Sequence, residues 1–225
     1  CRVKMMKNKL SSVQKMLNVW AIVLILWAVY RVYFQTNLPA WFDELFAKPV
    51  IYLTPIYYYI STYEKGNFLE SIDLKTKNLK QNVLFGIGIG VVFFLTGAIV
   101  QYFKSGEILL LGSASLFQIA YFSFIAFASS FSEEILSRGF VLKRLYEDSK
   151  NVLSSVFFAS FLFFFLHIPI LFSNPNLHGL VLLQVMVTDI LLSFAVSFLY
   201  LQRRNVMVPI LIHAFYNLSL YLLIS

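Results

Sequence analysis

Long apolar runs separated by short polar intervals dominate the pattern along the chain. Because about 20 helical residues cross a hydrocarbon core of ~30 Å, each long run predicts a membrane-spanning helix. The runs, of which the second is short, cover residues 17–34, 49–63, 83–103, 108–132, 152–172, 180–201 and 206–224. The sequence therefore predicts an all-α, polytopic transmembrane helical bundle of about seven spans, within a range of six to eight.

The composition supports a chain that lies in lipid. Of its 225 residues, 59% are hydrophobic and only 13% are charged, and the mean hydropathy is +0.75. These values lie outside the range of ordinary soluble domains. The single cysteine, Cys1, supports neither an internal disulfide nor a thiolate metal cluster.

The net charge of +7 is concentrated in alternate polar intervals. Lys and Arg number five before the first run, four after the second, four in residues 138–151, and two at Arg203 and Arg204. The other intervals hold only Lys48 and Lys104, which are placed in outer loops. Because cytoplasmic loops of membrane proteins collect Lys and Arg, the N-terminus is predicted to be cytoplasmic. This pattern favours the lipid bilayer of a cell membrane and argues against nucleic acid as a partner. The small size and the richness in Lys and Asn favour a bacterial cytoplasmic membrane.

Chemically active side chains interrupt the apolar runs in the second half of the chain. Each ionisable group inside a span costs roughly 2.5 to 3.5 kcal/mol on insertion scales, so it needs a partner or a function. Glu134 and Arg138 are four residues apart with the acid first, which predicts an ion pair. Glu133 points about 100° away toward serines, so it is the freer carboxylate and the candidate general base. An ion cluster that anchors a helix end is the competing explanation.

A histidine in the following run is predicted to lie level with this pair. If the two runs form an antiparallel hairpin that turns near Lys150, Glu133 and His167 are each 17 residues from the turn. Phe163 lies one helical turn before His167, and Pro169 is expected to kink or end the helix and so aim the imidazole. A lone histidine in a helix is usually a packing residue, but the position of His167 at the level of the two glutamates favours a catalytic role.

The last run carries a second pair, His213 and Asn217, which share a helix face. Together they could donate hydrogen bonds to the oxyanion that forms when water attacks a carbonyl. The alternative is an interhelical hydrogen-bond pair, worth about 0.6 kcal/mol on average.

Two further polar residues are left outside the predicted site. Asp189 could pair with Arg138, bond Thr188 and Gln184, or meet another helix. His178 lies in a short outer segment and is assigned no role. Elsewhere, the polar interval 64–82 is a candidate loop for docking substrate.

Three motifs in order, Glu-Glu-x-x-x-Arg at 133–138, Phe-x-x-x-His at 163–167 and His-x-x-x-Asn at 213–217, resemble those of the CPBP family. This family of CaaX proteases and bacteriocin-processing proteins, also called Abi, is similar to prenyl-protein CaaX endopeptidase. Each motif alone is weak, but their order is specific. The resemblance implies a catalytic helical core at 113–225, preceded at 1–112 by N-terminal transmembrane helices and a cytoplasmic loop.

The resemblance also implies a role for each motif residue. Glu133 with His167 would activate water, Glu134 and Arg138 would organise the site, and His213 with Asn217 would stabilise the oxyanion, with Phe163 in support. If a divalent metal such as zinc is present, Glu133, His167 and His213 would bind it, although glutamate and histidine can activate water without one.

The implied function is an intramembrane endopeptidase that acts on a membrane-associated peptide or protein. Its substrate would be a peptide, bacteriocin or pheromone precursor, or a CaaX-like tail. The main alternative is a noncatalytic membrane scaffold or bacteriocin-immunity protein of the same fold. A small transporter that relays protons through its buried Glu, His and Asp residues is a second alternative.

Overall fold

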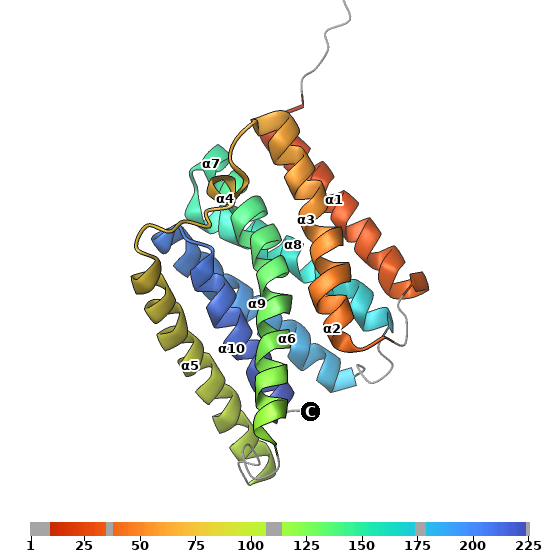
Figure 1. Cartoon of the computed structure of the whole chain (residues 1–225), viewed down its shortest axis with the longest axis vertical. Coiled ribbons are helices and arrows are strands. Elements are labelled where there is room, and N and C mark those ends of the chain that lie inside the picture. The colour runs from red at the N-terminus through yellow and green to blue at the C-terminus, as the bar shows by residue number, and fades with distance from the viewer. Residues whose placement is uncertain (1–9, 35–37, 107–113, 174–178, 224–225) are drawn as a thin grey trace, which may run out of the picture.

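The computed structural model describes residues 10–34, 38–106, 114–173 and 179–223, which are mainly helical (Figure 1). The elements are α1 (Ser12–Val29), η1 (Tyr30–Phe34), α2 (Ala40–Phe42), η2 (Asp43–Ala47), α3 (Lys48–Tyr59), η3 (Ile60–Glu64), α4 (Phe68–Ser71), α5 (Leu79–Ser105), α6 (Leu116–Glu134), η4 (Ile135–Leu142), α7 (Lys143–Ser149), α8 (Val152–Ser173), α9 (Gly179–Arg203) and α10 (Met207–Leu223). The η segments are π-helical. Each predicted run overlaps a helix, and the described residues contain no strand, so the all-α prediction is confirmed.

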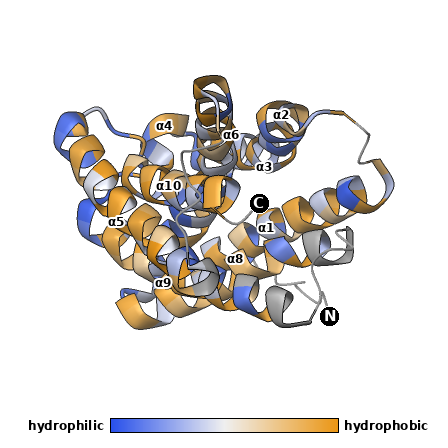
Figure 2. Ribbon diagram, turned by 90° about the horizontal axis from the view of Figure 1, so that it is seen from below, coloured by the Kyte–Doolittle hydropathy of each residue, from blue (hydrophilic) through white to orange (hydrophobic). Residues whose placement is uncertain are grey.

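The helices have the length and surface of membrane spans. Five helical segments of the described chain are long and apolar enough to cross a membrane, and α10 is a shorter apolar helix. Seen end-on, the helices are mainly hydrophobic around the bundle (Figure 2). Large apolar side chains such as Ile25, Leu95 and Leu191 are exposed there. Such a surface is stable in lipid rather than in water, and the chain is a multi-pass membrane protein.

The second run differs from its prediction at its amino end. Residues 40–64 form one continuous helix, because the chain is helical from α2 through η3. Lys48 therefore lies within a helix and is only 2% exposed, so its placement in an outer loop was wrong. Charge counting misplaced it because a lysine that borders an apolar run can equally be a loop residue or a buried ion-pair partner.

The helices around the site pack in a definite order. In Figure 1, α1 and α3 lie at one edge, α5 lies against α10 at the other edge, and α6, α8 and α9 lie between them. The contact between α5 and α10 depends on small residues, as the spacing of Gly86 and Gly90 suggests. A Cβ atom added at Gly90 would lie 2.7 Å from the Phe215 ring, so glycine allows the close approach.

The hairpin that was predicted from the fourth and fifth runs is present. Ser115 caps α6 through a reciprocal hydrogen-bonded box with Gln118, and the chain stays helical to Ser149. Lys150 then adopts a left-handed conformation at φ 55° and ends α7, and α8 returns from Val152. The turn therefore lies at the position that brings Glu133 and His167 to the same level of the hairpin.

The charged intervals gather at one end of the bundle. Arg144 of α7 forms an ion pair with Glu64 at 2.8 Å, and the Arg204 guanidinium lies 4.6 Å from the centroid of the Tyr146 ring. The amino-terminal end of α1 lies at the same end, whereas α10 ends at the opposite one (Figure 1). The expected gathering of positive loops on one side is thus present, and the assignment of that side to the cytoplasm stays a prediction.

Asp73 organises the polar interval at this end. Its carboxylate accepts hydrogen bonds from Tyr200 at 2.8 Å, Lys143 at 3.0 Å and Lys75 at 2.6 Å. Burial alone would raise the pKa of Asp73, but the bonds from these three side chains outweigh it, and the pKa is lowered below the usual 3.8. A carboxylate with a lowered pKa stabilises the fold above its ordinary pKa and loses that effect as the pH falls.

We therefore expect Asp73→Asn to lower the free energy of unfolding by about 1 to 3 kcal/mol at pH 7. The difference from the wild type should shrink as the pH falls below about 4, because the carboxylate takes up a proton first in the unfolded chain and, at lower pH, also in the folded protein. Thermal unfolding in detergent across this pH range measures it, with the exposed Asp148→Asn as control. A difference that is independent of pH would contradict the charge-based explanation.

Candidate active site

All the motif residues meet at one place inside the bundle. The cluster consists of Glu133 and Glu134 at the end of α6, Arg138 in η4, Phe163 and His167 on α8, and His213 and Asn217 on α10. Both glutamates, Arg138 and His213 are buried. Residues separated by up to 84 positions in sequence (217 minus 133) therefore form one polar cluster in an apolar interior.

The predicted ion pair between Glu134 and Arg138 is confirmed. Arg138 Nη1 lies 2.7 Å from Glu134 Oε1. The rest of the guanidinium is held by α9, because Nη2 donates to Ser193 Oγ at 2.8 Å and Nε donates to Ser197 Oγ at 3.4 Å. The Phe163 ring lies 4.6 Å from the guanidinium carbon, at cation–π distance. Arg138 thus joins α6, α8 and α9 at the site.

Glu133 is not the unpaired carboxylate that the sequence suggested. Its Oε1 atom lies 2.8 Å from Nζ of Lys48 and 3.3 Å from Oγ of Ser129. Lys48 also forms an ion pair with Glu44 at 2.5 Å. The local pattern around Glu133 contains only serines, so it could not reveal a cation that comes from another helix. The one sequence signal was the spacing of Glu44 and Lys48 by four residues, which is typical of a helical ion pair.

His167 lies level with Glu133, as the hairpin geometry predicted. The distance from His167 Nε2 to Glu133 Oε2 is 3.9 Å. On the other side of the ring, Nδ1 lies 3.1 Å from the carbonyl oxygen of Phe163, whose own ring packs edge-on at 4.7 Å. Pro169 does not end the helix, because α8 continues to Ser173. The imidazole is instead aimed by its bond to the carbonyl one turn earlier.

His213 connects the two glutamates. Its Nδ1 atom lies 2.7 Å from Glu134 Oε1, and its Nε2 atom lies 3.7 Å from Glu133 Oε2. Asn217, one turn later, donates to Ser130 Oγ at 3.2 Å. His213 and Asn217 therefore each make an interhelical hydrogen bond, which was the alternative explanation for their presence in the last run. Their role toward an oxyanion stays a prediction.

Comparison with protein families places this cluster in a known group. Residues 114–219 match the family model described as type II CAAX prenyl endopeptidase Rce1-like. This segment, 106 of the 225 residues, is similar to Rce1-like domains. The expected resemblance to CaaX proteases is thereby confirmed, and the family is one of membrane proteases. Comparison with curated proteins and with solved structures gave no match.

The matched segment contains every candidate motif residue, but it does not contain the cation at Glu133. Lys48 and Glu44 precede residue 114 and lie in α3 and η2, which both pack against α6. The site is therefore completed by a part of the chain that lies outside the family match.

Asp189 lies near the Rce1-like site without joining its bonds. It accepts a hydrogen bond from Tyr216 of α10 at 3.3 Å. Of the three arrangements expected from sequence, contact with another helix is thus found, and Arg138 pairs with Glu134 instead. His178 lies outside the described residues.

The three side chains proposed as metal ligands do not fit a metal in this arrangement. Within the described residues, no three His, Cys, Asp or Glu side chains are grouped closely enough to hold an ion. Glu133, which would have to bind the divalent cation, is already paired with the ammonium group of Lys48. The positive charge of Lys48 would repel a metal cation at this distance. The hydrolytic step proposed below therefore uses side chains alone.

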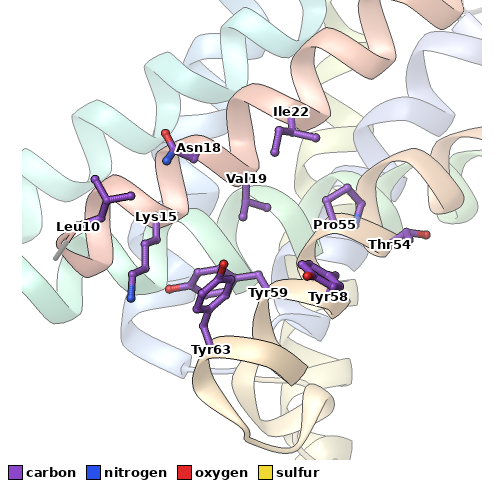
Figure 3. Close-up of a pocket in the computed structure, with 10 residues that line it drawn as sticks. All are labelled: Leu10, Lys15, Asn18, Val19, Ile22, Thr54, Pro55, Tyr58, Tyr59 and Tyr63. Atoms are coloured by element: carbon purple, nitrogen blue, oxygen red, sulfur yellow. The ribbon is translucent and has the colours of Figure 1, made fainter. Parts of the chain in front are cut away.

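A separate groove of about 780 Å³ lies between α1 and α3 (Figure 3). Val19, Ile22 and Pro55 form part of its apolar wall, and Tyr63 lies near Lys15, whose Nζ atom is 5.2 Å from the centroid of the Tyr63 ring. None of the residues that line it belongs to the polar cluster, so this groove is distinct from the Rce1-like site.

Proposed function

We propose that the chain is an intramembrane endopeptidase that cleaves a membrane-associated peptide or protein with water activated by Glu133 and His167. The observation that carries the proposal is the convergence of Glu133 Oε2 with the Nε2 atoms of His167 and His213, at 3.9 and 3.7 Å. Two imidazole nitrogens thus lie close to one carboxylate oxygen inside an apolar bundle. The similarity of residues 114–219 to a membrane protease family supports the same reaction class.

The bonds around His167 favour a tautomer that suits a base. A carbonyl oxygen can only accept, so His167 Nδ1 carries the proton that it donates to Phe163. Its Nε2 then presents a lone pair toward Glu133. A water molecule that donates to two acceptors at about 2.8 Å holds them about 4.4 Å apart. The measured 3.9 Å is close to this span, so one water can donate to both groups.

Hydrolysis can then proceed with every proton assigned. As the water oxygen attacks the carbonyl carbon, one proton passes to Glu133 Oε2 and the carbonyl oxygen becomes an oxyanion. His213 donates through Nδ1 to the Glu134 carboxylate, and the doubly protonated imidazolium form also donates through Nε2 to this oxyanion. The Asn217 amide is the second donor. When the C–N bond breaks, Glu133 returns its proton to the leaving amine. The second proton of the water stays on the attacking oxygen until His167 Nε2 takes it up as the product carboxylate forms.

Glu134 and Arg138 are the organising pair in this proposal. Glu134 holds the His213 ring through Nδ1, while Arg138 holds Glu134 and is itself fixed by α9. The substrate class is a precursor of a small peptide, a bacteriocin or a pheromone, or a CaaX-like tail, processed at a bacterial cytoplasmic membrane. The apolar surroundings favour a substrate that reaches the site from the bilayer.

The test is cleavage of a fluorogenic peptide library, with and without lipid-anchored peptides, by detergent-purified protein. We expect endopeptidase products that persist after chelation, because the hydrolytic groups are side chains. Loss of activity on chelation that zinc restores would replace this mechanism with a metal-dependent one. A monodisperse protein that cleaves no member of the library would favour the scaffold alternative.

A further inference from the structure

A lysine from the amino-terminal half of the chain enters the site. Lys48 Nζ lies 2.8 Å from Glu133 Oε1, 2.8 Å from Ser129 Oγ and 2.5 Å from Glu44 Oε2. The ammonium group donates hydrogen bonds to Ser129 and Glu133 and forms an ion pair with Glu44. A charged lysine that is only 2% exposed is rare unless it is paired in this way.

The position of this ammonium group is fixed by the helices that carry it. In η2, the Asp43 carboxylate accepts a hydrogen bond from Tyr30 and lies 3.9 Å from Arg31, which ties the segment to η1, directly after α1. The ring of Trp27 lies 5.5 Å from Lys48 Nζ and covers it at cation–π distance. Lys48 thus approaches Glu133 from a packed support and not from a mobile loop.

Lys48 determines which oxygen of Glu133 is available for chemistry. Because Oε1 is bonded to Lys48 and Ser129, Oε2 is the oxygen that faces His167 and His213. Without a cation, a carboxylate inside lipid would favour its neutral form and could not take a proton from water. Lys48 therefore both orients the carboxylate and maintains its negative charge.

Glu44 keeps Lys48 paired while Glu133 holds the proton taken from water. When Glu133 accepts a proton it no longer balances the charge of Lys48, and an unpaired buried ammonium is strongly unfavourable. Glu44 already lies 2.5 Å from Lys48 Nζ, so the ammonium group stays paired throughout. Two carboxylates around one lysine thus allow the charge of Glu133 to change without leaving a buried charge alone.

We propose that Lys48, held by Glu44, is a positioning residue that presents Glu133 Oε2 as an ionised base to the hydrolytic water. The inference rests on the proposed peptidase function, since it assigns a role toward the same general base. It extends the working site to residues outside the family match at 114–219. The ammonium group of Lys48 supplies a fixed positive charge beside the catalytic carboxylate.

The first test is Lys48→Met, which keeps the length of the side chain and removes its charge. We expect kcat to fall by roughly 100-fold, the cost of a misplaced catalytic group, with KM within about two-fold of the wild type. Lys143→Met is the matched control, because Lys143 also binds a carboxylate at 3.0 Å, but at the polar end. Its kcat should stay at the wild-type value, measured per folded molecule by size-exclusion chromatography.

The second test is Lys48→Ala, assayed with and without propylammonium, which replaces the missing atoms beyond Cβ. Restored cleavage supports the proposal, because a purely structural contact would not be rescued during the assay. Absence of rescue, or a kcat for Lys48→Met within about two-fold of the wild type, would overturn it. If the wild type cleaves nothing, or Glu133→Gln stays active, the proposed function itself fails, which distinguishes the two failures.

Discussion

Replacing Glu133 by glutamine is expected to lower kcat for peptide cleavage by about 10²- to 10⁴-fold, the usual contribution of a general base. Glutamine has the same shape, and its amide oxygen can still accept the bonds from Lys48 and Ser129 that Oε1 accepts now. The amide cannot take a proton from water, so the chemical step is lost. Steady-state kinetics of the purified variant on a cleaved peptide measure kcat and KM separately.

Folding should survive this change because Lys48 keeps Glu44 as its partner at 2.5 Å. Asp189→Asn is the matched control, since Asp189 is also a buried carboxylate and accepts a hydrogen bond from Tyr216 instead of a lysine. It should retain kcat within a few-fold of the wild type. An equal loss of kcat in both variants would mean that any buried carboxylate is required for folding. A kcat of Glu133→Gln equal to that of the wild type would remove Glu133 from the mechanism.

Hydropathy predicted the fold well because lipid imposes one requirement on every span. Backbone groups must be bonded within the segment, so a long apolar run becomes a helix whatever its neighbours are. The runs at 83–103 and 152–172 accordingly lie within α5 and α8. The run at 49–63 was predicted less well, because the helix begins at Ala40 and its first part carries charged residues.

The meeting of Glu133 and His167 was also predictable, and for a local reason. A hairpin of two helices fixes the level of each residue from its distance to the turn, so the sequence alone placed the two side chains together. Their measured separation of 3.9 Å confirms that reasoning. The ion pair of Glu134 with Arg138 followed in the same way, from one turn of one helix.

The partner of Glu133 could not be predicted, because it comes from a helix 85 residues earlier. Rotation of the helix that carries Lys48 about its own axis determines whether the ammonium faces the site, and no local pattern specifies that rotation. The serines of α9 that bind Arg138 were missed for the same reason. Ser193 and Ser197 look like ordinary small residues of an apolar run until α9 is packed against η4.

Replacing Arg138 by methionine is expected to lower the free energy of unfolding by about 3 to 5 kcal/mol, the range measured when one member of a buried ion pair is removed. Glu134 would keep its bond with His213 but lose its cation, and the guanidinium bonds to Ser193 and Ser197 would be lost. Thermal or denaturant unfolding in one detergent measures the effect. Arg144→Met is the matched control and should cost less, because its partner Glu64 is 30% exposed at the polar end.

The double variant Arg138→Met with Glu134→Gln separates the unpaired charge from the lost packing. If the cost of the single variant comes mainly from a buried carboxylate without its cation, neutralising Glu134 should recover a large part of the stability. The double variant should nevertheless cleave poorly, since a glutamine at 134 no longer holds His213 Nδ1 through a carboxylate. A double variant that is no more stable than Arg138→Met would show instead that the bonds from Arg138 to α9 carry the stabilisation.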